Sequence, residues 1–499
     1  MAPKSGSNGR EVSRRTVLET TGAALAGGAF SLAASGGLAS AHEFSGDTST
    51  GTTSSSHDHT DASTHGKTGN AELLDYHSLG AVGSSAESGT ADSPHYGGIT
   101  ELRTNGDYAY VGCFSSDNPT GDRGMAVLDI SEFNAAEKPK ELRAAELSVV
   151  AFLRNDDPAA AVMDVKVSAD GQFVFLSKQP YTALFDETDP KPDTDGDGAS
   201  ASASALQAID VSDPANPLVV GTYDAWTTGP HNATYHEIDG EEYVFAVKDL
   251  GDGTSGLYAF RFERTTGALA LLNRWTYDGD LGVGDGGLAY IHDITIQDDP
   301  RLDTPVGYLS YWDQGLFALD LADPTNIEML GHYSMNAAHY AEPAPTYLDG
   351  TRVLVAGQEL SSQQDGSSGT VYLLDADGLD RGFDGTDNVA RLDEWNWQEN
   401  VSFENFTLSP HNFDVTADGR VHLGHYHGGT RFLAIDVSGE SLAEEGYFQA
   451  AKEVPESSKT EGLNHAAPFT WSAVEHEGVT YVSDTNTGVY AIRYKPGGT

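Results

Sequence analysis

Histidine recurs at one position of a repeated pattern. Only 17 of the 499 residues are histidine, yet six of seven repeat units open with one. Imidazole is the commonest metal ligand among side chains, and it also titrates near neutral pH. Equivalent positions in a ring of repeats would bring these side chains to a shared axis. The six are His95, His231, His292, His339, His411 and His465, and in the remaining unit the matching position is Met163.

A second set of polar side chains stands where the second strand of each unit should end. If the first two strands of a unit are antiparallel, the start of one and the end of the other lie at the same edge. His425 and His427, in a His-Tyr-His sequence, would alternate onto one strand face. The candidates at this edge are Asp313, Glu359, His425 and His427.

Imidazole and carboxylate together suit a transition metal, here copper, iron or zinc, and a thioether would favour copper(I). Two other interpretations of the histidines stay open. They could hydrogen-bond between units and seal the mouth of a channel, or they could form a ring that binds an anionic or sugar ligand without metal. The sequence does not choose among the three.

An acidic loop offers a weaker metal hypothesis. Asp193, Asp195 and Asp197 alternate with Thr and Gly, as at the start of a calcium-binding loop. An EF-hand would place Glu at the twelfth position, where this chain has Ser204. A solvated acidic loop explains the same residues, so calcium remains an alternative.

Familiar catalytic signatures are missing. The sequence has no Gly-x-Ser-x-Gly elbow, no phosphate-binding loop with Lys-Ser/Thr, no His-Glu-x-x-His and no Cys-x-x-Cys. Nucleotide-dependent and serine-hydrolase functions therefore have no support. The single cysteine, Cys113, excludes an internal disulfide and is expected to be a small, partly buried residue.

The elements that position these residues are short strands. The segment from Ala205 to Tyr223 recurs in variants such as Gly315–Asn326 and Thr430–Ser438, each an apolar run that is often closed by Asp-Pro or Asn-Pro. Such segments cannot bury their faces alone, so the copies must pack on one another. Helical periodicity is expected only near residues 132–148. The units are placed at 94–150, 160–225, 229–278, 288–336, 337–400, 408–450 and 463–495.

The last unit has only three strands before the chain ends. Residues 72–79, in turn, are similar to the fourth strands of other units. The first strand of the domain can therefore complete the last unit and remove its free edges. The prediction is an all-β fold, a seven-bladed β-propeller of four-stranded blades closed by the N-terminal strand.

The Leu-Asp-Val-Ser-Asp-Pro pattern resembles the LVIVD-repeat family of secreted propeller-like proteins, over about residues 72–495. A histidine-lined propeller is also similar to the copper domain of nitrous oxide reductase and to the selenium-binding, methanethiol oxidase family. The further motifs of those two families are not found here, and one cysteine cannot build a second copper centre of the former. Only the class of chemistry is carried over as a hypothesis.

The composition is strongly acidic. Lys and Arg total 28 against 75 Asp and Glu, for a formal net charge of -47. Nucleic acid and anionic membranes are therefore poor partners. Because molar salt shortens the Debye length to about 3 Å, we expect a salt-adapted, halophilic protein, in resemblance to haloarchaeal exported proteins.

The N-terminal region indicates export. Residues 1–41, with Ser13-Arg14-Arg15 and a small-residue site ending at Ala41, resemble a twin-arginine signal, although Val17 and Glu19 depart from its usual residues. Residues 42–70 have the composition of a disordered linker rich in Ser, Thr and His, and 71–499 form the propeller. An extracellular or cell-surface location follows, with membrane attachment only if the signal stays uncleaved.

These observations predict an exported propeller with a histidine-lined metal site at one channel mouth. An enzyme built this way would be a metal-dependent oxidoreductase acting on a small molecule. The alternative is a non-enzymatic propeller that binds an extracellular protein or glycan.

Overall fold

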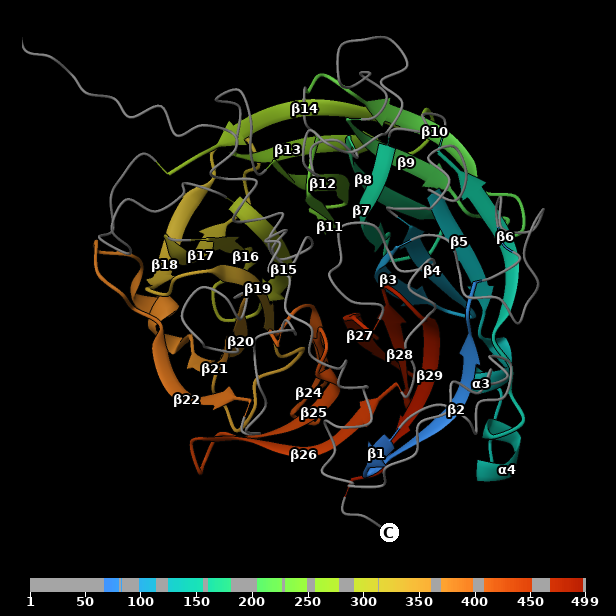
Figure 1. Ribbon diagram of the computed structural model, residues 1–499. Helices are drawn as coiled ribbons and strands as arrows, with labels where there is room; N and C mark the ends of the chain where they lie inside the picture. Colours follow the sequence, from blue (N-terminus) through green and yellow to red (C-terminus); the bar gives the residue numbers. More distant parts are fainter. Residues whose placement is uncertain are drawn as a thin grey trace, which may run out of the picture.

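The strands form seven antiparallel sheets arranged as blades around a central axis (Figure 1). This is a seven-bladed β-propeller, so the predicted fold class is confirmed. The computed structural model describes residues 67–79, 82, 98–113, 124–155, 160–180, 204–226, 229–248, 256–277, 291–312, 314–359, 369–397, 408–450 and 467–496.

Each blade is built from consecutive strands, numbered from the axis outward. Blades one to three contain β3 (Ile99–Asn105), β4 (Tyr108–Cys113), β5 (Gly124–Asp129) and β6 (Ser148–Arg154); β7 (Ala160–Val167), β8 (Phe173–Pro180), β9 (Ala205–Asp210) and β10 (Leu218–Tyr223); and β11 (Asn232–Ile238), β12 (Glu241–Lys248), β13 (Gly256–Glu263) and β14 (Ala268–Trp275). Blades four and five contain β15 (Ile291–Asp299), β16 (Thr304–Tyr311), β17 (Gly315–Asp320) and β18 (Glu328–Tyr333); and β19 (Ala338–Pro343), β20 (Val353–Gln358), β21 (Thr370–Asp375) and β22 (Ala390–Asn396). Blades six and seven contain β23 (Phe413–Val415), β24 (Arg420–His425), β25 (Gly429–Asp436) and β26 (Ser441–Gln449); and β27 (Thr470–His476), β28 (Val479–Asp484) and β29 (Gly488–Tyr494).

The core lies between neighbouring blades. Middle strands such as β9 and β16 are buried on both faces, because each blade is covered by a neighbour on either side. Between blades one and two, for example, Tyr110 and Val127 pack with Leu176 and Ile209. The apolar runs of the repeat are therefore the inter-blade contacts, as the sequence pattern indicates.

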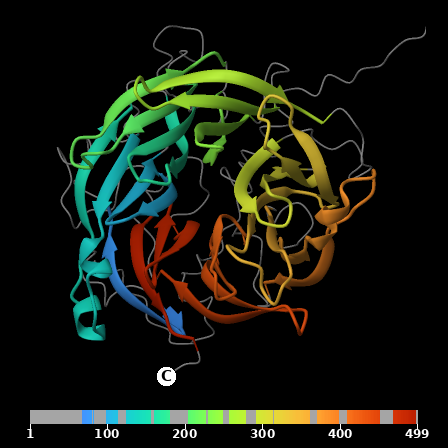
Figure 2. The ribbon, with the colours of Figure 1, turned by 180° about the vertical axis from the view of Figure 1, so that it is seen from behind.

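The ring is closed by the N-terminal strand. β2 (Ala71–His77) pairs antiparallel with β29, from Ala71 opposite Tyr494 to His77 opposite Val489. Figure 2 shows β2 lying beside the C-terminal strands. The predicted completion of blade seven is thus confirmed. A further short strand, β1 (Lys67–Gly69), lies at the end of the range expected as linker and pairs with β26.

The described residues contain little helix. Within the range expected to be helical lie α3 (Ser131–Asn134) and α4 (Pro139–Leu142), and a 3-10 helix, η4, spans Asp377–Arg381. None of the helices in the described part of the chain has the length and apolar character needed to cross a membrane.

β-Bulges interrupt the innermost strands near their starts. In blade four the register shifts between Ile291 and Asp293, and in blade five between Ala338 and Tyr340. The extra residues are His292 and His339. A bulge turns its extra side chain away from the regular alternation. The same shift occurs around Met163 in blade two and around Trp471 in blade seven. A β-bulge therefore recurs near the start of the innermost strand in several blades, at one end of the central axis.

Candidate metal centre

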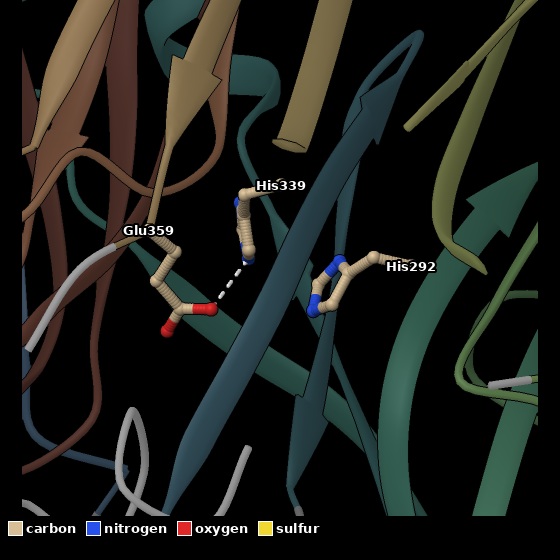
Figure 3. A group of neighbouring side chains, drawn as sticks. All are labelled: His292, His339 and Glu359. Atoms are coloured by element: carbon tan, nitrogen blue, oxygen red, sulfur yellow. Dashed lines mark ion pairs between the residues drawn. The ribbon is translucent and has the colours of Figure 1, made fainter. Parts of the chain in front are cut away.

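Three buried side chains meet at this mouth. His292, His339 and Glu359 are the one group of His, Cys, Asp or Glu in the described residues whose ligand atoms all lie within 4.8 Å of one another. Nε2 of His339 is 3.4 Å from Oε2 of Glu359, and His292 approaches from the neighbouring blade (Figure 3). This group could hold a metal ion.

The backbone explains why these three side chains converge. His292 and His339 are the bulge residues of β15 and β19, so both leave the strand alternation at the same level. Glu359 follows the end of β20, and its amide donates to the carbonyl oxygen of Ala337, just before β19. The expectation that first-strand starts and second-strand ends share one mouth is therefore confirmed in blade five.

The histidines form a continuous row. Ring centroids are 4.4 Å apart for His231 and His292, 4.1 Å for His292 and His339, and 4.3 Å for His339 and His411. The row ends on Trp471, whose ring centroid is 4.3 Å from that of His411. Four of the six predicted entry histidines are thus brought together. The other two, His95 and His465, lie outside the described residues, as does Asp313.

Burial makes this site electrostatically unusual. It lowers the pKa of His292 and His339 well below the ordinary value, with neighbouring histidines adding to the effect, and it lowers the pKa of His411 to about 3. The imidazoles are therefore neutral at physiological pH, which is the form that binds metals. Burial also raises the pKa of Glu359 to about 8, although a hydrogen bond from Tyr426 opposes the rise.

The ring of His339 has no hydrogen bond to any described residue. Its side chain is 1 % exposed, and neither ring nitrogen has a hydrogen-bond partner in the part of the chain that the structure describes. Most buried polar side-chain atoms in proteins are hydrogen-bonded, so an exception needs an explanation. A metal on Nε2 would account for that nitrogen, and Nδ1 would still have no partner among the described residues.

The tautomer of His411 is fixed by its surroundings. Nδ1 lies 2.8 Å from the carbonyl oxygen of Trp471, which can only accept, so Nδ1 carries the hydrogen. Nε2 then presents its lone pair. This is the arrangement in which a carbonyl oxygen orients a metal-binding histidine.

Tyr426 is a site residue that sequence reasoning missed. Its phenol donates a hydrogen bond to Oε1 of Glu359, and its ring centroid lies 4.8 Å from that of His411. It is the central residue of the His-Tyr-His sequence, whose two histidines were expected to face the site. The strand alternation that supported that expectation stops at His425, because β24 ends there and Tyr426 has a φ of 29°.

The two histidines of that sequence have other neighbours. The ring of His425 stacks on Trp397 with centroids 5.3 Å apart, and its edge contacts Trp395 at 5.5 Å. The ring of His427 packs edge-on against Phe469 at 4.9 Å. Both are buried, and burial lowers the pKa of His425 to about 3. The calcium candidates Asp193, Asp195 and Asp197 lie outside the described residues.

Residues 202–225 match the family model described as LVIVD repeat. The chain carries an LVIVD repeat. The matched LVIVD segment contains β9 and β10 of blade two, and together with the seven blades it supports the family resemblance drawn from the sequence. A search of curated proteins finds no match.

Solved structures that are similar to this chain have low sequence identity to it. The periplasmic gluconolactonase PpgL of Pseudomonas aeruginosa is 10 % identical with a TM-score of 0.45, the match covering 80 % of this chain and 97 % of that one. A putative 6-phosphogluconolactonase from Bacteroides fragilis is 13 % identical, with a TM-score of 0.46 and coverages of 80 % and 96 %. The Cps50 (Swd1) β-propeller domain of Myceliophteria thermophila is 11 % identical, with a TM-score of 0.47 and coverages of 80 % and 96 %. None of these likenesses assigns an activity to this chain.

Proposed function

We propose that this propeller binds one transition-metal ion on His292, His339 and Glu359, with His411 as a further ligand, and uses it to oxidise a small molecule with dioxygen as the electron acceptor. The observation that carries the proposal is the convergence of two neutral imidazoles and one carboxyl group, from β15, β19 and the end of β20, with ligand atoms within 4.8 Å. A metal bound there would displace the carboxyl proton of Glu359. Two histidines and one carboxylate leave coordination positions open for other ligands, as in non-haem iron sites and in catalytic zinc sites.

The choice of metal follows from the donors. Nitrogen and oxygen ligands suit iron(II), copper(II) and zinc, and only the first two change oxidation state. The sole described methionine at a bulge position is Met163 in blade two, so a thioether would enter the site only if it reached across the mouth. Iron or copper is therefore the cofactor class of the proposed oxidoreductase, and zinc would restrict the site to Lewis-acid chemistry.

The first experiment measures metal content. The untagged protein is purified without chelator and its metals are determined by elemental analysis. We expect about one iron or copper ion per chain, and its loss in His339→Ala without loss of the fold. His422→Ala is the matched control, since His422 is also buried but bonds through Nδ1 to Thr480 Oγ1, 2.9 Å away. Wild-type protein that retains and binds no transition metal would refute the proposal.

The second experiment tests oxidation. Iron-loaded, copper-loaded and zinc-loaded protein are compared for oxygen uptake with a panel of small alcohols, aldehydes and thiols. Turnover that requires a redox-active metal supports the oxidoreductase. Metal binding without turnover by any of the three forms would refute the oxidase while leaving the metal site intact.

We propose further that the chain is exported and acts outside the cell or at its surface. The twin-arginine pattern in residues 1–41 and the formal net charge of -47 support this location and a salt-rich environment. The alternative function, a propeller that binds an extracellular protein or glycan, becomes the better hypothesis if no metal is found. Detection of the chain only inside the cells of its host would refute export.

A further inference from the structure

Tyr426 has a backbone conformation that its residue type disfavours. Its φ is 29°, on the positive side where non-glycine residues are uncommon and bulky ones are strained. Asp239, Asp349 and Glu477, which also have positive φ, lie in hairpin turns, whereas Leu79 and Ala337 do not. Tyr426 opens the β24–β25 hairpin connection, in which His425 pairs with Gly429, and it also forms an isolated bridge with Thr470 of blade seven.

The surrounding contacts hold Tyr426 in this conformation. The amide of Thr470 donates to its carbonyl oxygen at 3.0 Å, and the amide of Gly429 donates to the same oxygen at 3.1 Å. Its ring is fully buried and stacks on Phe469, with centroids 4.0 Å apart. Strained residues persist only where surrounding structure fixes them, and such residues cluster at functional sites.

The result is a fixed donor beside the candidate metal centre. Tyr426 lies in blade six and Glu359 in blade five, and the phenol donates to Oε1 of the carboxylate. The other oxygen, Oε2, faces Nε2 of His339 at 3.4 Å. One oxygen of Glu359 is thus held by hydrogen bonding, and the other points toward the imidazoles.

We propose that Tyr426 is the positioning residue of this centre, holding Oε1 of Glu359 so that Oε2 alone is presented as a monodentate ligand. This role rests on the proposed metal function. Partners that orient metal-ligating side chains typically change metal affinity by about 10- to 100-fold when they are removed. Tyr426 does not contact the metal in this arrangement and acts only through Glu359.

The test uses Co(II), whose visible absorption reports the geometry of its ligands. Co(II) affinity and spectrum are measured for wild type and for Tyr426→Phe, which keeps the stacked ring and removes only the hydroxyl. We expect about a tenfold or greater loss of affinity and a changed spectrum. Tyr235→Phe is the matched control. The Tyr235 phenol donates a hydrogen bond of 2.6 Å to Glu242 Oε1, and this pair is not part of the candidate metal centre. Tyr235→Phe should bind Co(II) as wild type does.

A double-variant cycle shows whether Tyr426 acts through Glu359. Adding Tyr426→Phe to Glu359→Ala should change Co(II) affinity by less than twofold, since the group to be positioned is already gone. Wild-type affinity and spectrum in Tyr426→Phe would overturn the role. So would a double variant weakened by the same factor as the single one.

The outcomes separate this role from the metal function. Co(II) bound by wild type with no effect of Tyr426→Phe overturns the positioning role and leaves the metal site standing. No Co(II) binding by wild type overturns both. Should Tyr426→Phe fail to fold, Glu359→Asp takes its place, because the shorter side chain cannot reach both the phenol and the metal. An unchanged Co(II) spectrum in that variant would also overturn the role.

Discussion

His411 donates its Nδ1 hydrogen to the carbonyl oxygen of Trp471 at 2.8 Å, across the boundary between blades six and seven. One side chain therefore joins two blades, and its ring centroid lies 4.3 Å from that of His339 in the histidine row. The same carbonyl oxygen also accepts from the amide of Asn412 at 3.2 Å. The structural role of His411 and its proposed role as a metal ligand can be separated because they use different ring nitrogens.

Asparagine and alanine at position 411 should differ in stability. The amide nitrogen of His411→Asn can replace Nδ1 as the donor to Trp471, whereas His411→Ala loses it. A buried hydrogen bond contributes about 1 kcal/mol, so we expect His411→Ala to be less stable than His411→Asn by about 1 to 2 kcal/mol in urea unfolding. Both variants lack Nε2 and should bind metal more weakly to the same extent. Equal stability of the two would contradict the role of this hydrogen bond.

The pair of Asp299 and Arg352 should make stability depend on acid pH. Both side chains are buried, and Tyr347 donates to Asp299 Oδ1 at 2.8 Å. Burial alone would raise the pKa of Asp299, but the hydrogen bonds from Arg352 and its neighbours outweigh it and lower the pKa to about 2. Because the folded pKa is below the ordinary value of 3.8, this contribution is present above pH 4 and lost as pH falls through 2.

The expected size follows from linkage. A depression of nearly two pKa units corresponds to about 2 kcal/mol at neutral pH. Asp299→Asn should therefore be less stable than wild type by about that amount at pH 7, and the gap should close toward pH 2. Urea unfolding across this range is the measurement, with the exposed turn variant Asp303→Asn as control. If wild type and Asp299→Asn differed by the same unfolding free energy at every pH, the stabilisation by Asp299 would not come from its charge.

The seven-bladed architecture could be predicted from the repeat pattern of the sequence. Runs such as Ala205–Asp210 are buried on both faces, and this double burial is what a stacked blade requires and what a continuous apolar strand indicates. The similarity of residues 72–79 to the fourth strands predicted the closure, because the same side-chain pattern fits the same place in a blade. The repeat pattern makes no prediction for the segments that connect the strands, because their sequences do not recur from one unit to the next.

The site could be predicted only in part. Histidine at equivalent positions marked His292 and His339, and antiparallel pairing placed Glu359 beside them. The bulges that aim these histidines are a backbone property with no separate sequence signal. Tyr426 was missed because strand alternation assigned it to the face opposite His425 and His427, and the alternation fails where β24 ends.

The contribution of Asp484 to stability should depend on pH in the opposite direction from that of Asp299. It is fully buried, and burial raises its pKa to about 6 although Thr487 and Asn486 donate hydrogen bonds to it. The folded pKa lies above the ordinary value of 3.8, so the folded state binds the proton more tightly. The contribution is complete below pH 4 and is lost as pH rises through 6.

Asp484→Asn should remove that loss. Asparagine can still accept from the donors of Asn486 and Thr487, and its amide can donate to Oγ1 of Thr470, which lies 3.3 Å from Asp484 Oδ2. Wild type should lose about 3 kcal/mol relative to this variant between pH 4 and pH 7. Thermal unfolding at stepped pH measures the difference, with the exposed turn variant Asp239→Asn as control. Parallel curves for wild type and Asp484→Asn would contradict the raised pKa.

Removal of the closing strand should destabilise the whole ring. β2 covers the edge of β29, buries Leu74 and Tyr76, and accepts a hydrogen bond on Asp75 from the amide of Leu147 in blade one, at 2.6 Å. Burying two large apolar side chains contributes about 3 to 6 kcal/mol, before the strand hydrogen bonds are counted. Deletion of residues 1–79 should therefore lower the unfolding free energy by at least about 5 kcal/mol, or yield unfolded protein. Deletion of residues 1–66, which keeps β1 and β2, should leave the melting temperature nearly unchanged. Similar melting temperatures for the two deletions would mean that six complete blades and three strands are stable without closure.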